Sequence, residues 1–142
     1  MNGAEYTGMS PSDTIKSELQ VKKMTEEEAF SYLNMKYGTR FTWKLLLLSE
    51  ATGYFVRELK KELGEDHELF RNNIYAVASN GVNDEVLYLV GDLHGGGGIY
   101  RIYHLTYSAD NPPGYPRYME FKGIEAVRDF FEAKILIKSL KP

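Results

Sequence analysis

EVLYLVGDLHGGGGIYRIYHLTY, residues 85–107, consists of two β-rich segments joined by a glycine run. The first segment, Glu85–Val90, is apolar, and the second, Ile99–Tyr107, alternates its side chains between two faces. Both faces of the second segment carry apolar residues, which is typical of a strand with neighbours on both sides. The stretch therefore predicts a β-hairpin at the centre of an antiparallel sheet.

One more strand is expected before this hairpin and one after it. Ile74–Ala78 is β-rich and is followed by Asn80-Gly81, a strong signal for a tight turn. Arg117–Phe121 is the fourth strand, and the proline-broken loop Asn111–Pro116 precedes it. We therefore expect a four-stranded antiparallel sheet.

Helical patterns lie on both sides of the sheet-forming sequence. Thr25 and Glu28 form a capping box before a helix over residues 26–37, and Gly38 suits a left-handed C-cap. The apolar run at 42–51 fits either a strand or a buried helix, and a helix is favoured.

Two further helices complete the expected set. The first covers residues 54–63, between Gly53 and Gly64, and the second begins at Ile124. The latter carries a core stripe at helical spacing: Ile124, Val127, Phe131 and Ile135. The fold class is therefore α+β, with N-terminal helices, a four-stranded antiparallel sheet and a C-terminal helix, all helices packing on one face.

Composition limits the possible functions. The length of 142 residues is typical of one domain. We place that domain at 12–142, after a flexible tail at 1–11. Residues 12–23 fit either a short helix or an extended arm. A net charge of -3 without a basic stripe argues against nucleic-acid binding. No cysteine, apolar leader or membrane-length apolar run is present, so we expect a cytoplasmic protein without a membrane contact.

The glycine loop resembles parts of three catalytic loops. Gly91–Gly95 resembles the first motif of calcineurin-like metallophosphoesterases, and His94–Gly98 resembles an esterase oxyanion loop, but neither set of partner motifs follows. A phosphate loop would need a Gly-Lys-Ser/Thr and a helix after it. The loop residues, Asp92, His94, Gly95, Gly96, Gly97 and Gly98, are therefore interpreted as a polar hairpin turn.

Metal and acid–base chemistry remain as an alternative. A small metal-dependent hydrolase would use Asp92, His94 and His104, provided that the loop folds back over the strand. The acidic clusters, Glu26–Glu28 on one helix and Glu58, Glu62, Glu65 and Asp66 on another, are interpreted as solvated faces. No cofactor is expected.

Tyrosine and arginine provide the main indication of function. The chain has 11 tyrosines, several of them in or beside the predicted sheet. Because tyrosine and arginine are enriched where proteins meet partners, we expect a protein-binding surface rather than an active site. The predicted contact residues are Tyr100, Arg101, Tyr103, Tyr115 and Arg117.

Three stretches together resemble the SUKH superfamily. Residues 28–54 contain a helix ending at glycine, an aromatic segment and a leucine-rich stretch, similar to the opening of that family. Residues 87–100 resemble its strand, Gly/Asp-rich turn and following strand, and Val127, Phe130 and Phe131 resemble its closing helix. The chain departs from the family at Phe41-Thr42, where a proline is usual, and at Thr52-Gly53 in place of Asn-Gly.

The resemblance covers about residues 25–137 and concerns function as well as fold. It implies a non-catalytic protein-binding domain, of the kind found in bacterial immunity proteins that occlude a cognate toxin and in eukaryotic cell-wall scaffolds. Residues 54–63 look like an additional helix relative to that family. No residue-level binding motif carries over.

Overall fold

Strands β3 (Glu85–Asp92) and β4 (Gly98–His104) form the central hairpin of an antiparallel sheet in the computed structural model, which describes residues 23–108 and 110–140. The strand order is β1-β2-β3-β4-β5, so each strand pairs with its neighbours in sequence. The α+β class and the central position of β4 are confirmed. The tail expected at 1–11 and the helix or arm expected after it lie outside the described residues, apart from Lys23.

The sheet has five strands rather than the four predicted. β2 (Tyr75–Asn80) and β5 (Tyr118–Lys122) match predicted strands, and the additional strand is β1 (Trp43–Leu45). The helix favoured for 42–51 is therefore wrong, because that segment holds β1 and only one short 3-10 turn, η3 (Leu48–Glu50).

Pairing with a distant segment explains why this apolar run is extended. Lys44 lies opposite Ser79, and the Leu46 amide donates to the Val77 carbonyl over 2.9 Å. The Trp43 ring packs on Phe131, with 4.7 Å between ring centroids. Contacts between residues so far apart in the chain have no local sequence signal, and they override helix propensity here.

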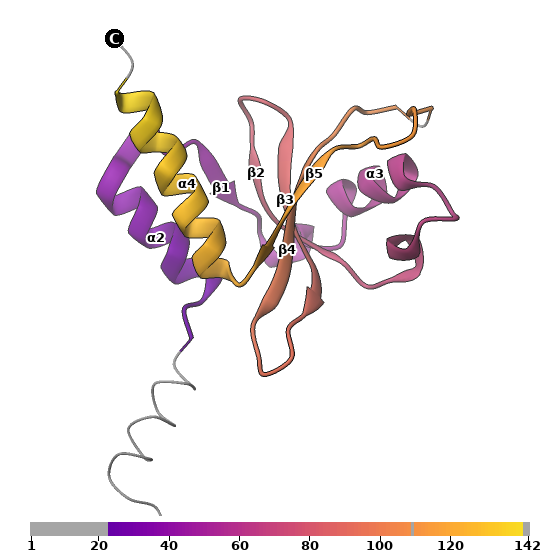
Figure 1. Ribbon diagram of the computed structural model, residues 1–142, viewed down its shortest axis with the longest axis horizontal. Coiled ribbons are helices and arrows are strands. Elements are labelled where there is room, and N and C mark those ends of the chain that lie inside the picture. The colour runs from indigo at the N-terminus through magenta and orange to yellow at the C-terminus, as the bar shows by residue number, and fades with distance from the viewer. Residues whose placement is uncertain (1–22, 109, 141–142) are drawn as a thin grey trace, which may run out of the picture.

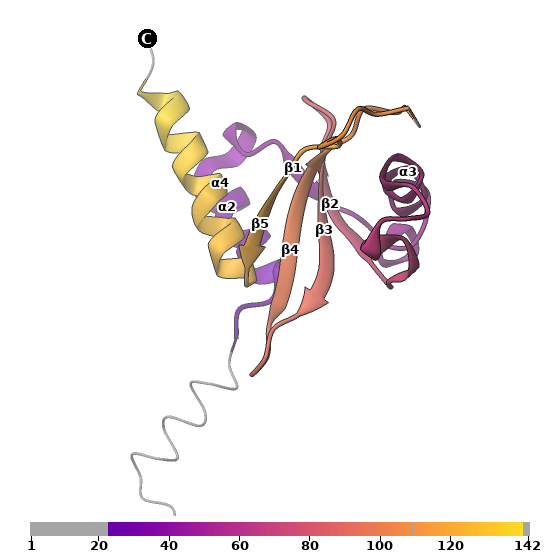
Figure 2. The same cartoon turned by 45° about the vertical axis from the view of Figure 1, so that its right-hand side comes forward.

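Two helices cover one face of the sheet. α2 (Glu26–Tyr37) and α4 (Ile124–Ser139) lie side by side on it, as Figures 1 and 2 show. The predicted capping box is present: the Thr25 hydroxyl accepts from the Glu28 amide over 3.0 Å, and Glu28 accepts from the Thr25 amide. The predicted stripe of α4 is buried, and it shares a core with residues of the sheet, among them Ala78, Leu87, Tyr100 and Ile102.

The opposite face is covered by α3 (Tyr54–Leu63), which lies on the far side of the sheet in Figures 1 and 2. Its Val56 and Leu59 pack on a second core that includes Val86, Tyr88 and Tyr103. The expectation that all helices pack on one face is therefore wrong. Successive side chains of a strand point to opposite faces, and residues 86 and 87 are both apolar. A helix must therefore pack on each face to bury them.

Two short turns join these parts. η2 (Gly38–Arg40) follows α2, and Gly38 has a positive φ of 57° there. η4 (Glu68–Arg71) connects α3 to β2. None of the helices within the described ranges is both long and apolar enough to span a membrane.

A polar cluster fastens α2 to α4 outside the aromatic core. Glu132 of α4 accepts hydrogen bonds from the Tyr37 and Tyr32 hydroxyls and from the Lys36 ammonium, the last at 3.0 Å. These three donors, with Tyr37 contributing most, lower the pKa of Glu132 from its usual value to about 2. The ionised carboxylate is therefore the form that joins the two helices.

We predict that this cluster makes stability depend on pH. A carboxyl whose pKa is lowered in the folded state stabilises the fold above its unfolded pKa, about 4.3, and loses that effect as pH falls toward 2. Glu132→Gln should therefore lower the urea midpoint at pH 7 and make little difference near pH 2. Glu65→Gln, at an exposed glutamate, is the control; an equal loss at both pH values, or in both variants, would contradict the assignment.

Candidate functional site

The glycine hairpin has a conformational explanation. Gly95, Gly96 and Gly97 have φ values of 88°, 104° and 92°, which side-chain-bearing residues rarely adopt. The buried Gly98 follows, and a Cβ placed there would lie 2.4 Å from a methyl of Leu89. The loop is closed by a hydrogen bond of 2.9 Å from the Leu93 amide to the Gly97 carbonyl. Geometry and close packing thus account for the four glycines.

The residues of the hydrolase alternative do not meet. Asp92 pairs with Gly98 at one end of the hairpin, whereas His104 pairs with Glu85 at the other. At about 3.3 Å per step, the six steps from Gly98 to His104 span about 20 Å. His94 lies in the short loop between Asp92 and Gly98, which the hydrogen bond from Leu93 to Gly97 closes, so this loop does not reach back to His104. The residues that the structure describes hold no group of three acidic, histidine or cysteine side chains that could bind a metal.

Two of the predicted contact residues belong to the core. Tyr100 is 5% exposed and faces the α2/α4 side, where its hydroxyl donates to Glu26 over 2.8 Å. Tyr103 is 0% exposed and faces α3. Burial raises the pKa of both tyrosines, and Glu26 raises that of Tyr100 further. The prediction that these rings contact a partner at the surface is therefore wrong.

Arg101 is placed at the boundary of the core by three contacts. Its Nη1 donates to the Tyr103 hydroxyl and its Nε to Glu120, each over 2.9 Å, and its guanidinium lies 4.1 Å from the centre of the Tyr118 ring. Burial lowers the pKa of Arg101, but the hydrogen bonds to Tyr103 and Glu120 outweigh it and the net shift is upward. Arg101 is therefore a fixed cation under an exposed tyrosine.

Tyr115 and Arg117 are exposed, as predicted, at the end of the loop between β4 and β5. The Arg117 guanidinium lies 4.9 Å from the centre of the Tyr115 ring, and the Arg117 carbonyl accepts from the His104 amide over 3.1 Å. Arg101, Tyr115, Arg117, Tyr118 and Glu120 together are called the Tyr/Arg surface. It belongs to β4, to β5 and to the loop before β5, which extends toward α3 in Figure 1.

Glu62 fixes the start of that loop. This residue of α3 is only 4% exposed, and its carboxylate accepts from the Thr106 amide, the Thr106 hydroxyl and the Tyr107 amide at 2.7–2.9 Å. Tyr107 has a positive φ of 59°, a conformation that needs such support. The interpretation of Glu62 as part of a solvated face is therefore wrong.

Three residues of this site were not predicted from the sequence: Glu62, Tyr118 and Glu120. For Tyr118 and Glu120 a signal existed, because antiparallel pairing of the strand at 117–121 with the strand at 99–107 places their side chains beside Tyr103 and Arg101. Nothing local distinguishes Glu62 from its acidic neighbours, since its partners are more than 40 residues away.

Comparisons with protein-family models, with curated proteins and with solved structures find no match for this chain.

We predict that Glu62 maintains the loop. Glu62→Gln keeps the shape of the side chain but removes its charge and replaces one acceptor oxygen by a donor group that faces an amide or hydroxyl. The free energy of unfolding should fall by about 2 kcal/mol, and the Thr106 and Tyr107 amides should exchange faster with deuterium. Asp66→Asn, at an exposed site beyond the end of α3, is the control; unchanged exchange in Glu62→Gln would show that the loop does not depend on this carboxylate.

Proposed function

We propose that this chain is a non-catalytic protein-binding domain that contacts its partner through the Tyr/Arg surface. The observation that carries the proposal is a pair of exposed tyrosine rings, each with an arginine stacked on it. Arg101 stacks on Tyr118, and Arg117 stacks on Tyr115. Aromatic and arginine side chains dominate the energetics of protein interfaces, because they bury large areas and form directional hydrogen bonds.

Preorganisation strengthens this argument. Binding costs free energy for every side chain that must be immobilised, about 0.5–1.5 kcal/mol each. Arg101 already has its contacts to Tyr103 and Glu120, and the Glu62 carboxylate already holds the loop that leads to Tyr115. The surface therefore presents its groups with little ordering left to occur on binding.

The kind of partner follows from the resemblance to the SUKH superfamily. We propose that the chain acts as an immunity-type protein in the cytoplasm, where it neutralises a cognate toxin by covering the toxin's functional site. The mechanism needs only occlusion, so it requires neither a cofactor nor a catalytic group. Two features support this proposal: the order of helices and strands, and the exposed Tyr/Arg surface.

The experiment has two stages. The tagged chain is first purified from its native host, and the retained protein is identified and expressed alone in a test bacterium. We expect that protein to stop growth and co-expression of this chain to restore it. A retained protein without toxicity, or none at all, would contradict the immunity role.

The second stage tests the surface by calorimetry with the purified pair. Arg117→Ala should weaken binding about 30-fold, the effect of losing a side chain worth about 2 kcal/mol. Arg57→Ala, at an exposed arginine of α3, is the matched control and should bind like the wild type. Equal effects of the two substitutions would exclude the Tyr/Arg surface as the contact.

A further inference from the structure

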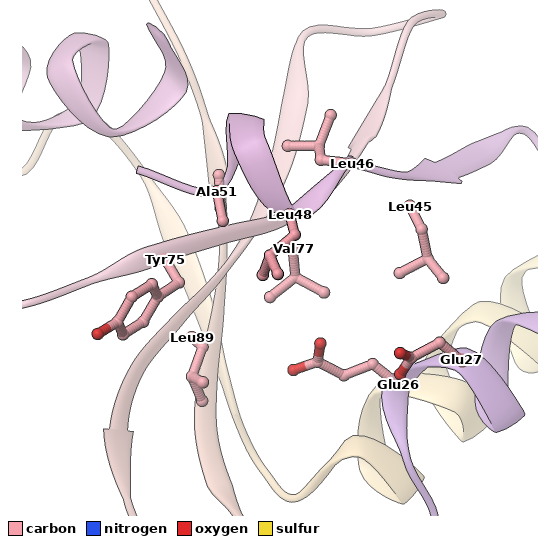
Figure 3. A pocket seen from close by; sticks show the side chains of 10 residues that line it. Glu26, Glu27, Leu45, Leu46, Leu48, Ala51, Tyr75, Val77 and Leu89 are labelled. Atoms are coloured by element: carbon pink, nitrogen blue, oxygen red, sulfur yellow. The ribbon is translucent and has the colours of Figure 1, made fainter. Parts of the chain in front are cut away.

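A groove of about 420 Å³ lies on the face of the sheet that α2 and α4 cover, between α2 and the segment that follows β1. Figure 3 shows its walls: Leu45, Leu46 and Leu48 on one side, Tyr75, Val77 and Leu89 along the sheet, and Glu26 and Glu27 on the side of α2. The groove is separate from the Tyr/Arg surface, because Leu89 packs on the α2/α4 core whereas Arg101 and Tyr118 lie with Tyr103 on the α3 side.

The leucines beside the groove are strongly exposed. Leu48 is 93% exposed and Leu47 is 69% exposed, and Leu45 and Tyr75 are also exposed. Apolar side chains gathered in this way on a surface are unfavourable in water and mark sites that another molecule covers. Leu45, Leu47 and Leu48, in the run for which a helix was favoured, therefore belong to an apolar surface.

Backbone hydrogen bonds keep these leucines in place. The Leu46 amide donates to the Val77 carbonyl over 2.9 Å, and the Ala76 amide donates to the Ala51 carbonyl over 2.8 Å. The Leu47 amide donates to the Glu50 carboxylate over 2.9 Å. Both ends of the segment are thus tied to β2. Leu46 packs on the α3-side core, whereas Leu45, Leu47 and Leu48 remain exposed because the backbone is fixed there.

The charge beside the apolar wall is negative. Glu26 and Glu27 both line the groove, and the Tyr100 hydroxyl donates to Glu26 and fixes that carboxylate. The pair would attract a cation and would repel an anionic lipid headgroup or a second acidic surface. An occupant complementary to both walls has aliphatic side chains on one side and lysine or arginine next to them.

We propose that this groove binds a basic amphipathic peptide segment of a partner protein. The aliphatic side chains of that segment contact Leu48, Val77 and Leu89, and a lysine or arginine pairs with Glu26 and Glu27. The volume suits a few side chains, and the exposed leucines at its edge extend the contact along the peptide. This site does not depend on the Tyr/Arg surface, so the chain contacts proteins on both faces of its sheet.

The test uses two synthetic peptides of the same length, one with the repeat Lys-Leu-Leu-Lys and one with Glu-Leu-Leu-Glu, each labelled for fluorescence anisotropy with the full chain. We expect the lysine peptide to bind at least about tenfold more tightly than the glutamate peptide, since like charges face each other in the second case. Amide chemical shifts of Leu48, Tyr75 and Leu89 should change on titration.

Variants then locate the binding. Leu48→Asp and Glu27→Lys should each weaken binding of the lysine peptide at least about tenfold. Val82→Asp is the matched control, because Val82 is 73% exposed, lies in the turn between β2 and β3, and changes the net charge of the chain as Leu48→Asp does. It should leave binding unchanged. The high exposure of Leu48 and of Val82 means that both variants should fold.

Four results would overturn the proposal. They are equal binding of both peptides, equal effects of Leu48→Asp and Val82→Asp, self-association of the chain that Leu48→Asp abolishes, and nuclear Overhauser contacts in the free protein between the Leu48 methyls and any of residues 1–22. The third would make a second copy the occupant, and the fourth a segment of this chain. None involves Arg117, so a failure here is distinguishable from a failure of the proposed function.

Discussion

Strands β3 and β4 bury side chains on both of their faces, and the positions of the other elements follow from this constraint. Another element must pack on each face to bury its apolar side chains. One face carries Leu87, Tyr100 and Ile102, and the other carries Val86, Tyr88 and Tyr103. α2 and α4 supply the first cover and α3 the second. β1 and β2 extend the sheet on one edge, and β5 completes it on the other.

The covers are incomplete, and the candidate surfaces lie where they end. On the α3 side, β5 is the edge strand, and its Tyr118 is exposed above Arg101. On the α2/α4 side, the N-terminus of α2 stops short of the leucine segment, and the groove remains between them. In each case an apolar or aromatic surface of the sheet extends beyond the helix that packs on it, with charged side chains at its border.

Much of the fold was predictable from local signals. The capping box at Thr25, the core stripe of Ile124 to Ile135 and the alternation around the glycine hairpin identified two helices and the central strands. Local signals failed where pairing partners were distant. β1 exists because Trp43 and Lys44 meet α4 and β2, and nothing in residues 42–51 specifies those neighbours.

The candidate site shows the same limit in another form. Period-two alternation correctly placed Arg101 and Tyr103 on one face and Tyr100 on the other, but it carries no information on which part of each face a helix covers. For this reason two of the five predicted contact residues proved to be buried. Glu62 illustrates the reverse case, a carboxylate in an acidic stretch that becomes buried because three donors of a remote loop converge on it.

The positive φ values at the tip of the β3–β4 hairpin restrict how this protein can diverge. Substitution of Gly95, Gly96 or Gly97 by any other residue is strained, so the tip can gain no new side-chain chemistry without a change of the turn itself. Side-chain variation that leaves the turn unchanged is therefore confined to other positions, such as His94 in the same loop, the loop before β5 and the leucines after β1. The most recognisable motif of the sequence is in this sense its least adaptable part.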